Sequence, residues 1–92
     1  MSTLPAWDLT RWLVEIAGWG GAVLILAAYA LLSAGRLTGQ SAAYQLMNLA
    51  GALGFVINGW WHGAIPNAVM NVIWAGIAIY SLSRLGRRRA RI

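Results

Sequence analysis

The chain has 92 residues, of which 60% are hydrophobic and only 10% are charged, and its formal net charge is +5. A soluble domain carries roughly 25% charged residues, so this composition excludes a surface that faces water on every side. Because the chain contains no cysteine, disulfides and thiolate metal sites are excluded as well.

The first predicted element is a membrane-spanning helix over residues 12–32, which follows a short polar lead over residues 1–11. About 20 apolar residues are enough to cross a hydrocarbon core of roughly 30 Å. Ala28-Tyr29-Ala30 has the small-x-small pattern of a signal-peptide cleavage site. The single arginine beside two acids ahead of the apolar run, and the length of that run, favour a retained helix over a cleaved signal.

A second span is predicted over residues 42–60. The loop before it contains Gly35 and Gly39, which both suit turns with positive φ. Ser41 suits the N-cap of the second helix, because its side chain can accept a hydrogen bond from the first turn.

A third span is predicted over residues 66–82, soon after Asn58-Gly59, a pair that indicates the end of the second helix. Pro66 suits the first turn of the third helix, where its missing N–H is not needed. The connection between the two spans is so short that they must be antiparallel neighbours. Backbone polar groups must be satisfied inside lipid, so the three stretches predict an all-α membrane protein with a three-transmembrane-helix bundle.

The arginines predict how this bundle, over residues 12–83, is oriented. The first loop and a basic tail over residues 84–92 share one side of the membrane and carry Arg36, Arg84, Arg87, Arg88, Arg89 and Arg91. Only Arg11 lies on the other side. By the positive-inside rule, we expect a multi-pass inner-membrane protein with its N-terminus out and its C-terminus in. Basic runs also bind nucleic acids, but a run directly after a span is more typical of a topology anchor.

Polar and small residues recur on one face of each predicted helix, since a helix advances about 100° per residue. One interpretation is structural: interhelical hydrogen bonds and pairs such as Ala17-x-x-x-Gly21 and Ala50-x-x-x-Gly54 hold membrane helices together. The other is functional: uncharged amides and aromatic rings line a pocket for a neutral polar solute. The faces contain Glu15, Gly18, Trp19, Ala22, Tyr29 and Ser33, then Ser41, Gln45, Asn48, Ala52, Phe55 and Asn58, then Asn67, Asn71, Trp74, Ala78 and Ser81.

Glu15 is the one formal charge inside a predicted span, about one turn from its outer end. A carboxylate at this position suggests proton coupling or contact with a cation, but it also suits pairing with Arg11 at i−4. His62 lies in the outer loop with no second histidine and no nearby acid, so no metal site is predicted. We find no nucleophile–base set and no phosphate loop leading to a lysine, so we expect neither an enzyme nor a cofactor.

Three segments carry a resemblance to a known family. They are Gly18-Trp19-Gly20-Gly21-Ala22 leading to Ala28-Tyr29-Ala30-Leu31-Leu32-Ser33, then Tyr44-Gln45-Leu46-Met47-Asn48-Leu49-Ala50-Gly51-Ala52, then Pro66-Asn67 through Trp74 to Tyr80. The chain resembles, over about residues 12–83, a family of small bacterial three-helix membrane proteins that are mostly uncharacterised and labelled permease-like. The segment that begins at Tyr44 is the most specific.

The layout is more distantly similar to SemiSWEET sugar transporters of the PQ-loop group, which are three-helix bundles that dimerise around a central site. This similarity implies that a tryptophan late in the second helix, Trp60 or Trp61, and an asparagine in the third, Asn67 or Asn71, contact the solute. The Pro-Gln hinge of that group belongs in the first helix, and this first helix has no proline.

Three helices enclose a solute path poorly, whereas two copies supply six, so we expect a homodimer in the lipid bilayer. The leading hypothesis is a permease-like protomer that moves a small neutral polar solute by rocking of the two bundles. The alternatives are a non-transporting accessory subunit that binds another membrane protein, and a small ion channel. The predicted substrate-binding residues are Asn48, Asn67, Asn71, Trp74, Trp60, Tyr29 and Gln45, with Glu15 as the predicted coupling residue.

Overall fold

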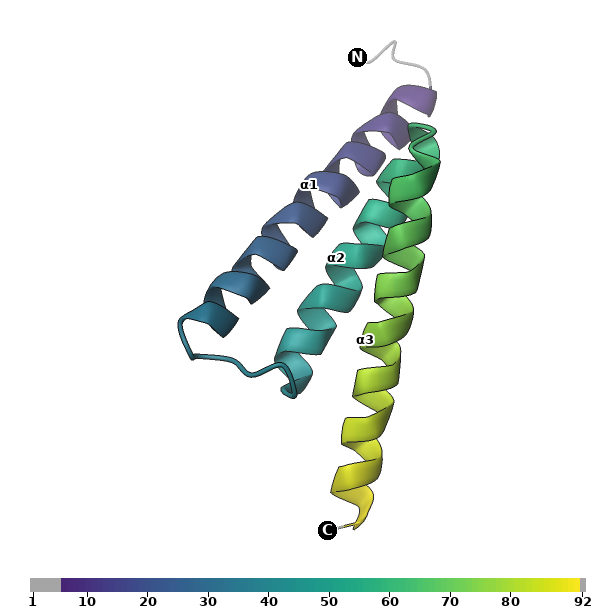
Figure 1. Ribbon diagram of the computed structural model, residues 1–92. Helices are drawn as coiled ribbons and strands as arrows, with labels where there is room; N and C mark the ends of the chain where they lie inside the picture. The colour runs from purple at the N-terminus through teal and green to yellow at the C-terminus, as the bar shows by residue number, and fades with distance from the viewer. Residues whose placement is uncertain (1–5, 92) are drawn as a thin grey trace.

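The computed structural model describes the backbone of residues 6–91 and the side chains of residues 8–87. Three α-helices make up almost all of it, α1 (Ala6–Ser33), α2 (Ala42–Trp61) and α3 (Ile65–Arg91) (Figure 1). The prediction of a three-helix, all-α fold is confirmed. The molecule measures 57 Å along its long axis and 24 Å in each of the other two directions.

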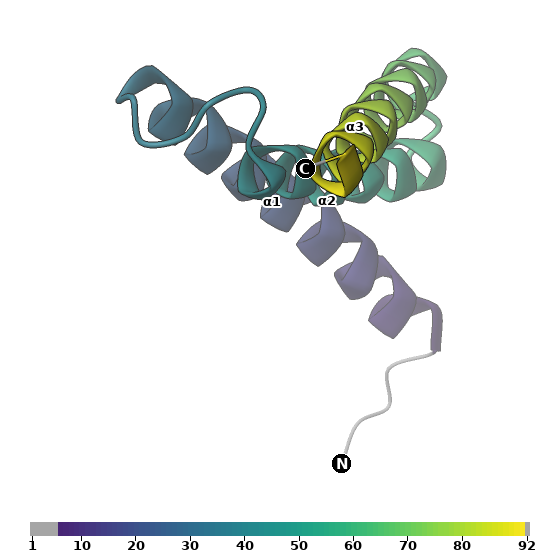
Figure 2. The ribbon, with the colours of Figure 1, turned by 90° about the horizontal axis from the view of Figure 1, so that it is seen from below.

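Helix α2 lies in the middle of the bundle. It packs against α1 and against α3, whereas α1 and α3 do not contact each other within the described part of the chain. Seen along the bundle, the two outer helices lean away from each other (Figure 2). Among the described residues there are therefore two separate helix–helix contacts and no core shared by all three helices.

Glycines form the contact between α1 and α2. A methyl group added to Gly21 would come within 2.7 Å of the Gly51 carbonyl oxygen, and one added to Gly54 would collide with the carbonyl of Ala17. Such close backbone approach is what small residues permit in helix pairs. The predicted contact through Ala17 and Gly21 is confirmed. On α2, however, the predicted Ala50 is exposed. The next residue, Gly51, lies at the contact with α1 instead, together with the predicted Gly54.

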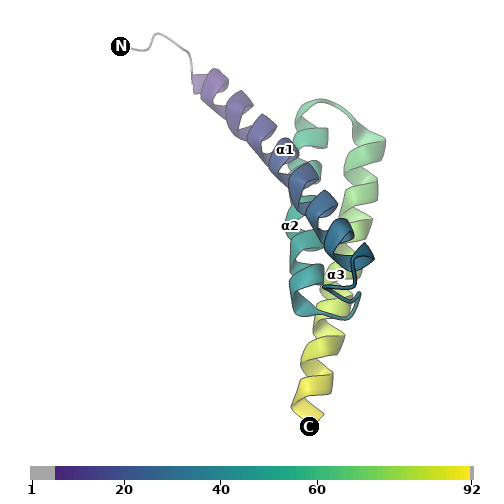
Figure 3. The same cartoon turned by 90° about the vertical axis from the view of Figure 1, so that its left-hand side faces the viewer.

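Helix α1 crosses α2 obliquely (Figure 3). The backbones approach most closely near the glycines at the middle of both helices and diverge towards the helix ends. Where the backbones diverge, only longer side chains can bridge the space between the two helices. The space between the start of α1 and the end of α2 contains the site described below.

Alanines form the contact between α2 and α3. Ala68, Ala75 and Ala78 of α3 are buried, and their spacing of seven and three residues places them on one face of the helix. The backbone N–H of Ala68 lies against Gly59, where a methyl group would approach it to 3.3 Å. Small residues therefore set both contacts of α2.

Two glycines with positive φ end the first two helices. Gly35 has φ +77° and Gly63 has φ +72°. After α2, the N–H of Ala64 donates to the Gly59 carbonyl at 2.8 Å and that of Gly63 to the Trp60 carbonyl at 3.2 Å, the paired bonds of a glycine-ended helix. The positive φ expected at Gly39 does not occur.

The second helix ends at Trp61, one residue beyond the predicted span of 42–60, but the helix-stop pair Asn58-Gly59 lies inside it. Gly59 is buried within α2, which continues to Trp61. The reason is packing: Gly59 lets α3 approach closely, so this glycine serves the helix contact and Gly63 supplies the turn.

The beginnings of α2 and α3 follow the sequence signals. The Ser41 side chain accepts a hydrogen bond from the Tyr44 N–H at 3.0 Å, which confirms the N-cap. Pro66 lies in the first turn of α3. Helix α3 runs on to Arg91, so most of the predicted basic tail belongs to the same helix as the third apolar stretch.

Within the part of the chain that the structure describes, two helices contain segments long and apolar enough to cross a membrane by length and composition, Asp8–Ser33 in α1 and Ile65–Arg87 in α3. Helix α2 is not among them. It carries three amide side chains, Gln45, Asn48 and Asn58, which lower its apolar character.

Candidate functional site

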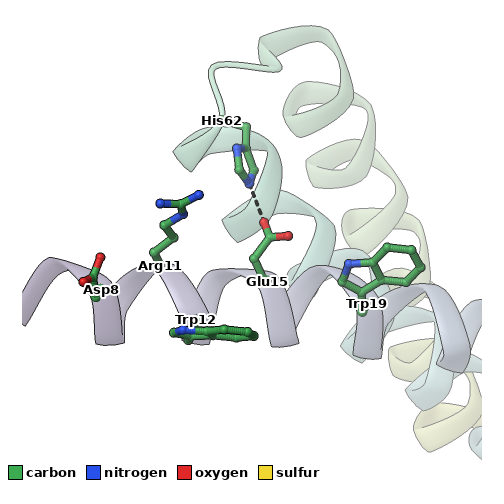
Figure 4. A pocket seen from close by; sticks show the side chains of 6 residues that line it. All are labelled: Asp8, Arg11, Trp12, Glu15, Trp19 and His62. Atoms are coloured by element: carbon green, nitrogen blue, oxygen red, sulfur yellow. Dashed lines mark hydrogen bonds and ion pairs between the residues drawn. The ribbon is translucent and has the colours of Figure 1, made fainter. Parts of the chain in front are cut away.

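An ion pair joins α1 to the end of α2. Nε2 of His62 lies 2.6 Å from Oε1 of Glu15, and both side chains are partly exposed. Figure 4 shows the two side chains pointing towards each other across the gap between the helices. The pair therefore bridges the helices where their backbones have diverged.

The end of α2 fixes the position of His62. His62 is the C-cap residue, and its backbone N–H donates to the Asn58 carbonyl at 3.1 Å. Gly63 follows with positive φ and turns the chain towards α3. The imidazole is thus held at a helix end, beside the α1 residue that carries the carboxylate.

Asn58 makes a second link between the two helices one turn earlier. Its Nδ2 donates to the Val14 carbonyl of α1 at 3.1 Å and lies 3.4 Å from Oε1 of Glu15. Val14 is buried. One carboxylate oxygen therefore has two neighbours from α2, and one of them also fastens the α1 backbone.

Two neighbouring pockets share the Glu15–His62 pair. The larger, with a volume of about 560 Å³, is lined by Asp8, Arg11, Trp12, Glu15, Trp19 and His62 (Figure 4). The second, about 410 Å³, is lined by Glu15, Gly18, Trp19, Ala22, Phe55, Asn58 and His62. Small-molecule sites typically have volumes of about 300–1,000 Å³. We call the larger cavity the Glu15 pocket.

Charges of both signs line the Glu15 pocket. Asp8 and Glu15 are acidic and Arg11 is basic. The formal charge of the lining is therefore −1 when His62 is neutral and zero when it is protonated. Within the described residues, no group of three or more histidine, aspartate or glutamate side chains could hold a metal ion.

The predicted substrate residues Asn48 and Gln45 of α2 donate hydrogen bonds to backbone carbonyls nearby in the sequence. Asn48 is buried, and its Nδ2 donates to the Tyr44 carbonyl of its own helix at 3.0 Å. Nε2 of Gln45 donates to the Gly39 carbonyl in the preceding loop at 2.7 Å. Together with Trp74 of α3, these side chains line a cavity of only about 110 Å³, which is smaller than a typical ligand pocket.

The predicted substrate residues of α3 pair with each other. Nδ2 of Asn71 lies 2.9 Å from the Asn67 carbonyl oxygen and 3.1 Å from Asn67 Oδ1. Neither side chain lines the cavity that contains Asn48 and Trp74. The predicted amide residues are thus divided between two places, and only Asn48, Gln45 and Trp74 lie together.

Trp60 and Tyr29 lie apart from every pocket described above. Trp60 is 72% exposed and Tyr29 is 64% exposed. The predicted face of α1 is also rotated from the buried one: Val14, Gly18, Gly21 and Ala28 are buried, whereas Trp19 is exposed. The small residues, rather than the polar ones, decide which side of α1 meets α2.

The sequence interpretation of His62 missed its partner. It assigned no nearby acid to this residue, but Glu15 lies within hydrogen-bond distance although it is 47 positions away in the sequence. A signal was present, because antiparallel neighbours bring the start of one helix beside the end of the next. Glu15 lies near the start of α1 and His62 at the end of α2.

Comparison with known proteins identifies a family. No curated protein and no solved structure shows a match to this chain, so the expected distant likeness to SemiSWEET transporters finds no support. A protein-family model, by contrast, matches residues 14–89. That span contains Glu15, Asn58 and His62, together with both helix contacts. The chain therefore belongs to this uncharacterised family.

Proposed function

We propose that this protein is an integral membrane protein whose three helices cross the inner membrane. Support comes from the apolar segments of α1 and α3, since only 17% of each is buried inside the chain. The core helix of a soluble protein would be mostly buried, whereas these apolar surfaces face outward. Lipid is the surrounding that such surfaces favour.

The proposed orientation has the N-terminus outside and the C-terminus inside. Arginines are concentrated at the end of the bundle that holds the loop between α1 and α2 and the end of α3. Both acidic residues of the chain, Asp8 and Glu15, lie near the opposite end. The positive-inside rule assigns the arginine-rich end to the cytoplasm, which opens the Glu15 pocket to the outside.

The function proposed for the protein is to bind and move a small neutral polar solute. The observation that carries this proposal is the Glu15 pocket, with its ion pair, its two indole rings and its volume of about 560 Å³. Charges of both signs suit a solute with hydroxyl or amide groups better than a simple ion, because either sign of ion meets a like charge. The solute site therefore differs from the amide face that the sequence suggested.

Glu15 and His62 have the chemistry to couple solute movement to a proton. A carboxylate and an imidazole at 2.6 Å can share or exchange a proton. A solute that hydrogen-bonds to Glu15 would compete with His62 for the same oxygen. Binding would then depend on the charge of His62, and a carboxylate inside a membrane segment is a position at which such coupling is expected.

A homodimer is part of this proposal. One protomer leaves α1 and α3 without contact to each other within the described residues, so a single chain does not enclose a path. A second copy would supply the missing wall, and rocking of the two bundles would expose the pocket to each side in turn.

The test is a swelling assay with proteoliposomes. Purified protein is reconstituted, and the liposomes are transferred into isosmotic glucose, glycerol or urea. The proposal predicts faster swelling than in protein-free liposomes for at least one of these solutes. Swelling at the protein-free rate for every solute would contradict it.

A second candidate function is a non-transporting accessory subunit. The observation in its favour is that Asn48, Gln45 and Asn71 already have hydrogen-bond partners within the chain, as expected of residues that only stabilise helices. Under this alternative, the reconstituted protein moves no solute, and the exposed apolar face of α1 binds a different membrane protein. Co-purification in mild detergent of one stoichiometric partner would support it.

A further inference from the structure

We propose that a second pocket, at the opposite end of the bundle from Glu15, binds the phosphate group of an anionic phospholipid. This pocket has a volume of about 230 Å³ and lies between the α1–α2 loop and α3. Its lining consists of Gly39, Gln40, Tyr80, Ser81, Arg84 and Leu85. We call it the Arg84 pocket.

The Arg84 side chain supplies the charge. Its guanidinium carbon lies 6.0 Å from the centroid of the Tyr80 ring, one helical turn earlier in α3. An arginine over an aromatic ring is held by a cation–π interaction, so less side-chain freedom is lost when it binds. Guanidinium groups donate paired hydrogen bonds to phosphate oxygens.

Uncharged hydrogen-bonding groups surround the guanidinium. Ser81 contributes a hydroxyl and Gln40 contributes an amide. The loop that carries Gln40 is fastened to α2, because the Gly39 carbonyl accepts a hydrogen bond from Gln45 Nε2 at 2.7 Å. The pocket therefore combines one cation with neutral groups on two fixed elements.

No acidic residue competes with a phosphate there. The chain has only two acids, Asp8 and Glu15, and both lie near the start of α1. The loop and the helix that form the Arg84 pocket carry no acid, and their other charged residues are arginines, among them Arg36 in the loop and Arg87 in α3. A basic pocket between membrane helices on the cytoplasmic side is a typical site for an anionic headgroup.

The lipid reaches this pocket because the protein is embedded in a bilayer, as proposed above. Leu85 gives the lining an apolar side, which suits a ligand that carries acyl chains next to its phosphate. Free inorganic phosphate has the same oxygens but no apolar part. The two sources are therefore separable by experiment.

The experiment titrates the purified full chain in neutral detergent with phosphatidylglycerol, with phosphatidylcholine and with inorganic phosphate, and counts bound molecules by native mass spectrometry. We expect phosphatidylglycerol to be retained at least about tenfold more tightly than phosphatidylcholine, since the choline group places a positive charge beside the same phosphate and repels the guanidinium of Arg84. Equal retention of the two lipids, or binding of inorganic phosphate with no preference for the lipid, would overturn the proposal.

Three variants separate a defined site from diffuse attraction. Arg84→Gln and the charge-neutral Tyr80→Leu should both weaken phosphatidylglycerol retention. Arg87→Gln removes the same charge outside the pocket. Any loss of retention that it causes should disappear in about 1 M salt, because charges more than roughly 3 Å apart are screened there. Equal effects of Arg84→Gln and Arg87→Gln in high salt would overturn the site. Glu15→Gln should leave lipid retention unchanged, so failure of the transport proposal would not imitate failure of this one.

Discussion

At the scale of single residues, the Glu15–His62 pair is the most informative contact in the molecule. Its partners lie on different helices and 47 positions apart, and Asn58 adds a third group from α2. Both side chains of the pair are more than a third exposed. Exposed ion pairs typically contribute only about 0–1 kcal/mol to stability, so this pair should add little to the stability of the fold.

The pair should show an energetic coupling between its two side chains. In a double-mutant cycle of Glu15→Gln and His62→Ala, followed by thermal unfolding in detergent, we expect a coupling of about 0.2–1 kcal/mol, the range of partly exposed pairs. Asp8 and Arg11 line the same pocket, and the cycle holds their contributions constant.

A matched control for this cycle pairs Glu15→Gln with Asn71→Ala. Asn71 lies on α3, which does not contact α1 in the described residues, so the two effects should add. A Glu15–His62 coupling no larger than that of this control pair would refute a direct interaction between the two side chains.

At the scale of the helices, small residues decide the architecture. Gly21, Gly51 and Gly54 bring the backbones of α1 and α2 into contact, and buried alanines of α3 do the same on the other side of α2. Because α1 and α2 touch at their middles and diverge towards their ends, the space for the Glu15 pocket follows from the glycine contact. A change in that contact should therefore affect both stability and the pocket.

Two neighbouring glycines of α1 provide a direct test of the contact. Gly21→Ala places a methyl group 2.7 Å from the Gly51 carbonyl oxygen, whereas Gly20→Ala meets no atom within 4 Å. Overpacking costs typically 1–3 kcal/mol, so Gly21→Ala should lower the thermal midpoint in detergent. Gly20→Ala should leave it unchanged or raise it, since alanine favours helix by up to about 1 kcal/mol. Equal midpoints for the two variants would rule out the glycine contact.

Much of the helical architecture could be predicted from the sequence. Apolar length predicted three helices, Ser41 predicted an N-cap, and Ala17 with Gly21 predicted half of a contact that the structure contains. These features are local, so a short stretch of sequence determines them. The helix-stop pair Asn58-Gly59 does not mark the end of α2, because Gly59 suits a turn and a helix interior equally well, and only its packing against α3 distinguishes the two.

The site was harder to predict, because it depends on which faces of the helices meet. The polar stripe of α1 does not coincide with its small-residue stripe, and the second one packs against α2. That rotation leaves Tyr29 exposed and brings Glu15 to the edge of the contact. His62 joins the site through the crossing of two helices, which no local pattern contains.

At the scale of the whole molecule, the protein has two chemically different ends. One end carries both acids of the chain, the single histidine and the Glu15 pocket; the other carries six of the seven arginines and the Arg84 pocket. Such an asymmetry is the expected pattern of a protein that spans a membrane in one orientation. The family model matches residues 14–89, which make up almost all of this architecture.

The absence of cysteine from the chain allows the orientation to be tested with single cysteines. Ala64→Cys lies in the turn between α2 and α3, and Gln40→Cys in the loop between α1 and α2. A membrane-impermeant maleimide added to whole cells should label the first and not the second, with both labelled after lysis. The reverse pattern would invert the topology, and labelling of neither or both in intact cells would contradict three spans.

The role of Glu15 in solute movement is tested by comparing Glu15→Gln with Asn71→Ala in the liposome swelling assay. Glu15 belongs to the pocket of about 560 Å³, whereas Asn71 pairs with Asn67 of its own helix. We predict that Glu15→Gln reduces swelling to the protein-free rate and that Asn71→Ala keeps the wild-type rate. If Asn71→Ala abolished swelling while Glu15→Gln retained it, the solute site would lie on the amide face, and the central role of Glu15 would be contradicted.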